Sequence, residues 1–205
     1  MTDELNQLAS ARADTLRLVA AMTQPHLDFS PGPGHWSIGE VVDHLLLVEQ
    51  MYRAEIAGLI ELKRAGHRPY LKRSFADINV SPLRLPQVVL PWLAMPLTVM
   101  NCFVPAIVRE LATEYGLLPS RNPDRATPRP RRPGDELRSG LLSSLAETRA
   151  LLAANTDLDF REMISAHPLT GASDVPHILR FLARHERRHQ SQIGRVKADR
   201  MFPAR

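Results

Sequence analysis

The sequence predicts an all-α protein, and this prediction rests on composition and on the placement of proline. Leu and Ala, which favour helices, total 51 of the 205 residues, whereas the strand-favouring Val and Ile total 20. All 17 prolines fall outside four windows, which are residues 1–24, 34–68, 134–167 and 177–202. Because a proline inside a helix costs about 3 kcal/mol, each window can hold one long helix. Four such helices suggest a four-helix bundle.

The first two helices are marked by apolar spacing and by a capping signal. Apolar residues alternate with polar ones at helical spacing over about 3–23, which predicts an amphipathic helix there. Ser37 and Glu40 have the spacing of a capping box, in which each side chain satisfies a backbone N–H of the first turn. Trp36 and Val41 occupy the matching hydrophobic-staple positions. The second helix should therefore start at residue 37.

The third and fourth helices follow the later proline-free windows. Leucines recur at helical spacing from about Asp135 onward and predict the third helix. Ser173 and Asp174 form a capping pair before the fourth helix, whose apolar stripe includes Ile178 and Ile193. Eleven of the prolines crowd into residues 69–133, so a long proline-rich insertion should separate helices two and three. We expect a single domain over residues 1–205, with the insertion at about 69–133.

An uncharged segment lies inside this insertion. Residues 85–108 carry no charge and are long enough to span a bilayer, but four prolines interrupt them. We interpret this segment as a broken helix that covers the bundle or forms a dimer interface. Contact with a membrane surface and a true membrane span are the alternatives, and repeated helix breaks disfavour the span.

Charge and cysteine content restrict the function classes. Cys102 is the single cysteine, which excludes a disulfide framework and a cysteine-rich zinc site. The net charge of +4 comes from two basic stretches, residues 121–138 and 177–202, while the rest of the chain is acidic. This is not the profile of a broadly basic nucleic-acid binder. The Arg/Pro-rich residues 119–133 lack aromatic side chains for base stacking, so we expect an extended, solvated linker. The acidic start at Met1 lacks the features of a signal peptide, which predicts a cytoplasmic protein.

Two histidines of the fourth helix have the spacing of metal ligands. His185 and His189 are four residues apart, which places them on the same helical face with Cβ atoms about 5–6 Å apart. Two imidazoles at that separation can converge on one divalent cation. Both lie on the apolar stripe, where unpaired ring nitrogens would each cost about 1–3 kcal/mol. Gln192 continues the stripe, and His44 lies on the apolar face of the second helix. Hydrogen-bonded core histidines are the alternative reading, above all for His44 alone.

The remaining histidine signals are weaker. His26, His35 and His67 sit in polar or Pro/Gly-flanked positions and are expected to be solvated. Residues 185–189 also match the HExxH pattern of zinc proteases, in which the glutamate is the general base. A protease of this class usually takes a third ligand from further along the chain, but no His or Glu follows His189. Glu186 is therefore expected to be a surface partner for neighbouring arginines.

Two segments resemble a known family. Residues 35–45, HWSIGEVVDHL, are similar to the second-helix signature of the DinB/YfiT-like superfamily. Residues 167–171, HPLTG, followed by residues 181–193, FLARHERRHQSQI, resemble its last-helix signature. The resemblance covers most of the chain in helix order and spacing, and it is weakest over residues 80–133.

The resemblance implies a fold, a metal site and a range of activities. Members are four-helix bundles, often dimeric, in which three histidines hold a divalent metal; these positions correspond to His44, His185 and His189. His167 belongs to the resembling motif as a turn or pocket residue rather than an established ligand. Characterised members include S-transferases that use low-molecular-weight thiols such as bacillithiol or mycothiol, a thiol-dependent isomerase and proposed hydrolases.

Three imidazoles leave at least one coordination position open, as in catalytic metal sites. The working hypothesis is a metal-dependent S-transferase or hydrolase that acts on a small electrophile, with a low-molecular-weight thiol as a candidate substrate and a homodimer as the expected assembly. Zinc or nickel is the favoured ion, with iron and manganese as alternatives. No catalytic side chain is predicted. A non-enzymatic metal-binding or sensor protein and a membrane-associated partner protein are the competing classes.

Overall fold

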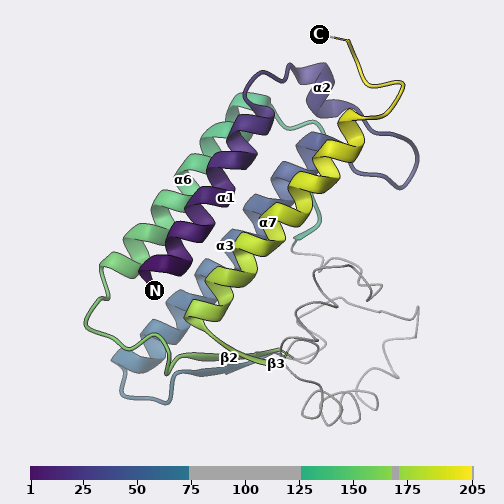
Figure 1. Cartoon of the computed structure of the whole chain (residues 1–205). Helices are drawn as coiled ribbons and strands as arrows, with labels where there is room; N and C mark the ends of the chain where they lie inside the picture. Colours follow the sequence, from purple (N-terminus) through teal and green to yellow (C-terminus); the bar gives the residue numbers. More distant parts are fainter. Residues whose placement is uncertain (74–125, 168–170, 205) are drawn as a thin grey trace, which may run out of the picture. The chain divides into compact units, whose positions relative to one another are not determined.

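The computed structural model describes residues 1–73, 126–167 and 171–204, and helices dominate these ranges (Figure 1). The helices are α1 (Thr2–Val19), α2 (Gln24–Asp28), α3 (Ile38–Arg64), α6 (Gly134–Ala153) and α7 (Val175–Lys197). Three short strands accompany them, β1 (Tyr70–Lys72), β2 (Ile164–His167) and β3 (Gly171–Asp174). The predicted helical class is confirmed, whereas α2 and the strands were not predicted.

The capping signals explain where two of the helices begin. The Ser37 backbone N–H donates to Glu40 Oε2 at 2.8 Å, and the Glu40 N–H donates to Ser37 Oγ at 3.2 Å, which is the reciprocal pair of a capping box. At the start of α7, Asp174 Oδ1 accepts the N–H of His177 at 2.7 Å. Both predicted helix starts are therefore confirmed.

Helix α1 ends earlier than the sequence suggested. It stops at Val19 rather than near residue 23, because Thr23 begins the separate short helix α2. The N–H of Thr23 donates to Nδ1 of His26, and Pro25 lies in the first turn, where a missing N–H is harmless. His26 is thereby 7% exposed, so the expectation of a solvated side chain was wrong for this residue.

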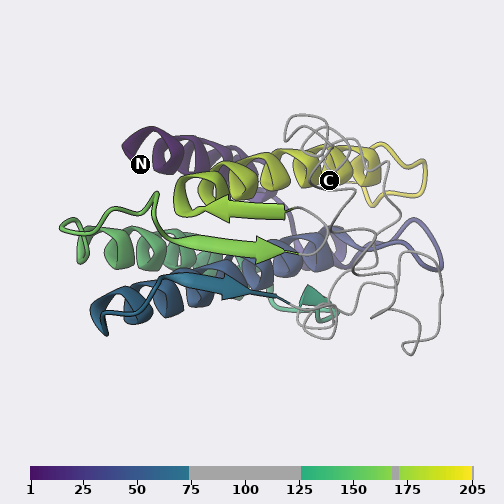
Figure 2. The same cartoon turned by 90° about the horizontal axis from the view of Figure 1, so that it is seen from below.

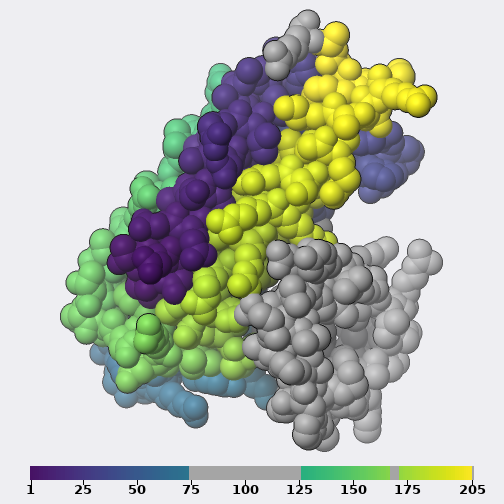
Figure 3. All heavy atoms as spheres, viewed as in Figure 1, coloured from purple at the N-terminus to yellow at the C-terminus, as the bar shows by residue number. Residues whose placement is uncertain are grey.

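The chain divides into two compact units. The first comprises residues 1–53, 126–157 and 179–205. Its apolar core joins α1, α2, α3, α6 and α7 through a cluster of buried side chains, namely Val19, Met22, Leu27, Ile38, Val41, Val42, Leu137, Leu141, Ile193 and Val196. Within this unit α1 lies against α7, as Figure 3 shows, and Gln190 donates to the carbonyl oxygen of Ala11 at 2.8 Å. At Gly39 the helix approaches the Leu27 carbonyl so closely that a Cβ would lie 3.1 Å from its oxygen.

The second unit contains the small sheet (Figure 2). Strand β2 is central, parallel to β1 and antiparallel to β3, with Tyr70 paired to Ile164 and Ser165 paired to Ser173. The buried Glu55 accepts hydrogen bonds from Arg73 and from Ser165. These contacts join the end of α3 to the sheet inside this unit.

Parts of the predicted insertion lie outside the described residues. This holds for the uncharged segment 85–108 and for residues 74–125 as a whole. The described end of the predicted linker 119–133 corrects the sequence expectation in part. Ala126 is fully buried, and Arg129 and Arg132 pair with the buried Asp43, although the Arg129 side chain is still 60% exposed. Within the described ranges, no helix is long and apolar enough to cross a membrane.

Candidate metal centre

Three histidines that are distant in sequence meet inside the first unit. His44 comes from α3, whereas His185 and His189 come from consecutive turns of α7. The ligand atoms that these rings can offer all lie within 4.8 Å of one another. Among them, His44 Nε2 and His185 Nε2 lie 3.1 Å apart. The structure thus brings together the three residues that the sequence had singled out.

The separations fit a single ion after a small adjustment. An imidazole–zinc bond is about 2.0–2.1 Å, so two ligands of one ion lie no more than about 4.2 Å apart. The 3.1 Å pair already satisfies this limit, whereas a pair at the 4.8 Å bound would have to shorten by about 0.6 Å to share the ion. With a shared ion in place, the lone pairs of His44 Nε2 and His185 Nε2 would both point at a cation and not at each other.

Hydrogen bonds to the opposite ring nitrogens orient two of the histidines. His44 Nδ1 lies 2.8 Å from the carbonyl oxygen of Ala126, and His189 Nδ1 lies 2.8 Å from Gln192 Oε1. A carbonyl oxygen can only accept, so Nδ1 must carry the proton in each bond and Nε2 keeps its lone pair. This is the usual arrangement behind a metal-binding histidine. Gln192 therefore lies beside His189 on the same face of α7, as the helical spacing predicted.

Burial keeps these imidazoles neutral. His44 and His189 are 1% and 8% exposed. Burial lowers the pKa of His44, and it lowers the pKa of His185 well below the usual value of 6.5. Burial, together with the neighbouring His44, lowers the pKa of His189 to about 3. The neutral ring is the form that binds a metal, so no proton has to be displaced near neutral pH.

Aromatic side chains flank the three imidazoles. The Trp36 ring lies 4.9 Å from the His44 ring and 6.4 Å from the His189 ring, centre to centre. Phe181 stacks on His185 at 5.4 Å, and Tyr52 packs on Phe181 at 5.3 Å. These contacts restrict ring rotation and surround the site with apolar surface, which strengthens electrostatic interactions within it.

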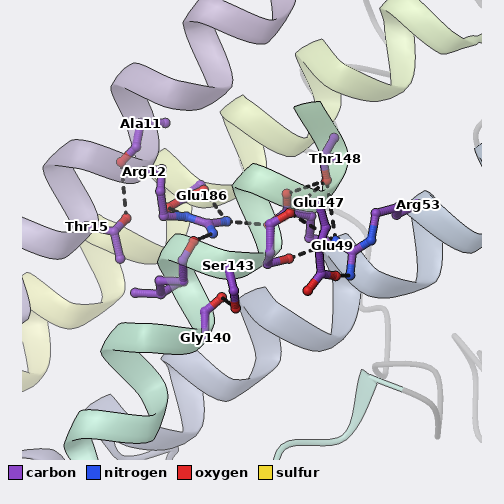
Figure 4. Close-up of polar contacts among 12 residues, drawn as sticks. Ala11, Arg12, Thr15, Glu49, Arg53, Gly140, Ser143, Glu147, Thr148 and Glu186 are labelled. Carbon is purple, nitrogen blue, oxygen red and sulfur yellow. Dashed lines mark hydrogen bonds and ion pairs between the residues drawn. The ribbon is translucent and has the colours of Figure 1, made fainter. Parts of the chain in front are cut away.

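Glu186, which lies between the two α7 histidines in sequence, points toward Arg12 of α1 (Figure 4). It is 1% exposed, and its oxygens accept hydrogen bonds from Arg12 at 2.8 and 3.1 Å. The same guanidinium binds Glu49 at 2.8 Å and the Leu141 carbonyl at 2.6 Å. The expectation of a surface partner was therefore wrong, because the helix turns Glu186 into a buried ion network. A carboxylate held in this way does not serve as the general base of a zinc protease.

Asp43, adjacent to His44, was not identified from the sequence. Its side chain is fully buried and accepts hydrogen bonds from Arg129 and Arg132. Burial alone would raise the pKa of Asp43, but the hydrogen bonds from these two arginines lower it below its usual value. The partners lie 86 and 89 residues further along the chain, so no local pattern could reveal them.

Among the described residues, the cluster of possible metal ligands contains no further histidine. His35 and His67 are exposed, as predicted. The backbone of His167 belongs to β2 and pairs with Gly171, while its side chain is outside the described part of the structure.

Comparison with known proteins establishes the family. The sequence profile of the DinB superfamily matches residues 7–193, which include the helices that carry all three histidines. The chain belongs to the DinB superfamily. No curated protein and no solved structure matches this DinB protein significantly.

Proposed function

We propose that this DinB protein is a metal-dependent enzyme in which His44, His185 and His189 hold the ion. The observation behind this proposal is the convergence of three imidazoles, two of them buried and that of His185 half-buried, whose ligand atoms lie within 4.8 Å of one another. Their neutral state and the hydrogen bonds behind His44 and His189 support the same assignment. The all-nitrogen ligand set suits zinc or nickel best, with iron and manganese as alternatives.

We further propose that the substrate is a small electrophile and that the nucleophile is a low-molecular-weight thiol or water. A divalent ion with three protein ligands retains an open position and supplies Lewis acidity, which lowers the pKa of a thiol or of water. The chain's own contribution is the aromatic packing of Trp36 on His44 and of Phe181 on His185, which would limit access of bulk water to the ion. In the transferase reaction a carbon–sulfur bond forms, the bond from carbon to the leaving group breaks, and the thiol proton is released to solvent.

The proposed architecture is the four-helix bundle of the DinB/YfiT type, with α1, α3, α6 and α7 as its long helices and the chain forming a homodimer. The shared apolar cluster of the first unit supports the bundle. A sedimentation-velocity run tests the dimer, because a monomer of 23.0 kDa and its dimer sediment at clearly different rates.

A conjugation assay tests the enzyme directly. Protein purified without chelators is analysed for metals and then incubated with a panel of thiols and a chlorodinitrobenzene dye. We expect stoichiometric metal and conjugation faster than the buffer control. His189→Ala should abolish both, whereas His35→Ala, which removes an exposed imidazole, should change neither. Conjugation that persists in metal-free His189→Ala protein would reject the transferase.

A non-enzymatic metalloprotein is the second candidate, because the histidines join two helices that are far apart in sequence. An ion there would act as a structural cross-link between α3 and α7. This alternative predicts that metal raises the melting temperature while no thiol, ester or amide substrate is turned over. A ligand present at 100 times its Kd stabilises the folded state by about 2.7 kcal/mol.

A further inference from the structure

The segment Ala126–Arg132, which we call the strap, leads into α6 and passes directly beside His44. The Ala126 end is fully buried, and its carbonyl oxygen accepts the hydrogen bond from His44 Nδ1 at 2.8 Å. The other end is fastened to the residue next to that histidine, Asp43. One short piece of chain therefore contacts two consecutive residues of α3.

Asp43 binds the strap through four hydrogen bonds. Its Oδ2 accepts the backbone N–H of Arg129 at 2.7 Å and the Arg129 Nε–H at 3.2 Å. Its Oδ1 accepts from one terminal nitrogen of Arg129 at 2.9 Å and from one of Arg132 at 2.8 Å. Hydrogen bonds between charged groups are about twice as strong as neutral ones, and the fork geometry of arginine fixes direction as well as distance.

The conformation of the strap suits this double contact. A turn at Pro130 and Arg131 separates the two arginines that bind Asp43. Arg131 adopts a φ of 56°, a left-handed conformation that non-glycine residues rarely take and that costs of the order of 1 kcal/mol. The ion pairs on either side offset that cost. The turn thus lets both guanidinium groups reach the same carboxylate.

Docking of the strap on Asp43 bears on which ring nitrogen of His44 carries the proton. The Ala126 carbonyl and the Arg129 amide belong to the first and third of three consecutive peptide units, so docking of Arg129 on Asp43 leaves the carbonyl little freedom to move. The carbonyl accepts a proton from Nδ1 and thereby selects the tautomer in which Nε2 has a free lone pair. Without that partner, the Nε2–H tautomer, which cannot bind a metal through Nε2, would compete.

We infer that Asp43, Arg129 and Arg132 are positioning residues that hold the Ala126 carbonyl against His44 and so prepare this imidazole for metal binding. The inference rests on the proposed metal site for its consequence, but the tautomer of His44 can be measured without any metal. Loss of a hydrogen-bonding partner behind a metal ligand typically weakens metal affinity by about 10- to 100-fold.

The test measures the His44 tautomer and the zinc affinity of the same variants. Nitrogen-15 NMR of the metal-free protein distinguishes Nδ1–H from Nε2–H imidazole, and competition with a colorimetric chelator gives the zinc Kd. We call the contact of Asp43 with the Arg129 and Arg132 side chains the clasp. Asp43→Asn removes its negative charge, and the double variant Arg129→Gln/Arg132→Gln removes both of its guanidinium groups. The double variant alters side chains that are 60% and 22% exposed and therefore keeps the fold testable if Asp43→Asn does not fold.

Two comparisons separate positioning from general stability. Arg129→Lys/Arg132→Lys keeps both charges but loses the fork geometry of arginine, so it should recover only part of the zinc affinity that the glutamine variant loses. Leu145→Ala leaves a cavity in the core of the same unit and should cost about 2–5 kcal/mol of stability without touching the strap. We expect it to leave the tautomer of His44 unchanged.

The expected result is a pure Nδ1–H tautomer in the native chain, mixed tautomers in both clasp variants and a zinc Kd weakened by about 10- to 100-fold. An unchanged tautomer in the double variant would overturn the inference. So would a Leu145→Ala protein that shifts the tautomer as strongly as the clasp variants do. If the native chain binds no zinc, the proposed function fails, whereas the tautomer measurement still decides the positioning role.

Discussion

Removal of the Arg12 side chain should destabilise the protein far more than removal of a surface arginine. Its guanidinium is 2% exposed and binds the carboxylates of Glu49 and Glu186, from α3 and α7. Burial alone would lower the pKa of Arg12, but the two carboxylates raise it above its usual value, so this side chain stays charged. Figure 4 shows the guanidinium between the two acidic groups.

Replacing Arg12 with Met should lower the free energy of unfolding by about 3–5 kcal/mol. The methionine fills a similar apolar volume, but the change leaves two buried carboxylates without their cation. Urea denaturation measures the loss. Arg17→Met is the matched control, since Arg17 lies on the same helix and is 79% exposed, so its loss should be within about 0.5 kcal/mol. Equal effects of the two substitutions would contradict the network.

The buried histidines should make the metal-free protein sensitive to acid. The pKa of His189 is about 3 in the folded protein and near 6.5 in an unfolded chain. Between these values the unfolded state binds the extra proton, so this contribution to stability is complete above pH 6.5 and declines as the pH falls towards 3. One such group gives a slope of about 1.4 kcal/mol per pH unit.

Urea denaturation at a series of pH values between 7.5 and 4.5, with a chelator present, measures this slope. His189→Gln should reduce the slope without removing it, because glutamine does not titrate whereas His44 and His185 still do. His35→Ala should leave it unchanged, because that ring is exposed. A native chain whose stability is constant over this range would rule out the buried neutral state of His189.

At the scale of elements, helix ends are set by local capping contacts. Substituting Ser37 with Ala removes the Oγ that accepts the Glu40 N–H at the start of α3. We expect a loss of about 1 kcal/mol in the free energy of unfolding. Thermal and urea unfolding measure it, with Ser143→Ala as control, because Ser143 lies exposed inside α6 and caps nothing there. A loss no larger than that of the control would argue against the capping box.

Local signals explain which elements could be predicted from the sequence. The starts of α3 and α7 depend on residues three positions apart, and the i,i+4 spacing of His185 and His189 places both on one helical face. The short helix α2 and the three strands gave no comparable signal. Strand β1 has only three residues, and it pairs with β2 more than 90 residues later in the chain.

Long-range partners explain what the sequence did not reveal about the site. Spacing alone left His44 as either a ligand or a core residue, and the family resemblance was needed to connect it with α7. Glu186 was misplaced because its partner, Arg12, lies 174 residues earlier. The Asp43 clasp was missed for the same reason. An Arg/Pro-rich stretch has the composition of a solvated linker, and only the structure shows that two of its arginines bind a buried carboxylate.

At the scale of the whole molecule, the histidine cluster brings together residues that are far apart in the sequence. His44 and His185 are 141 residues apart, and the DinB profile spans both. An ion held there would join α3 to α7 inside the first unit, next to its apolar core. Metal binding and folding of this unit should therefore be coupled.

X-ray absorption at the zinc edge tests most directly whether the three imidazoles share one ion. The account predicts one zinc per chain, with three imidazole nitrogens at about 2.0–2.1 Å. The number of imidazoles should fall by one in a His44→Ala protein that still retains metal. A spectrum of the native chain with fewer than three imidazoles around the zinc would contradict the shared site.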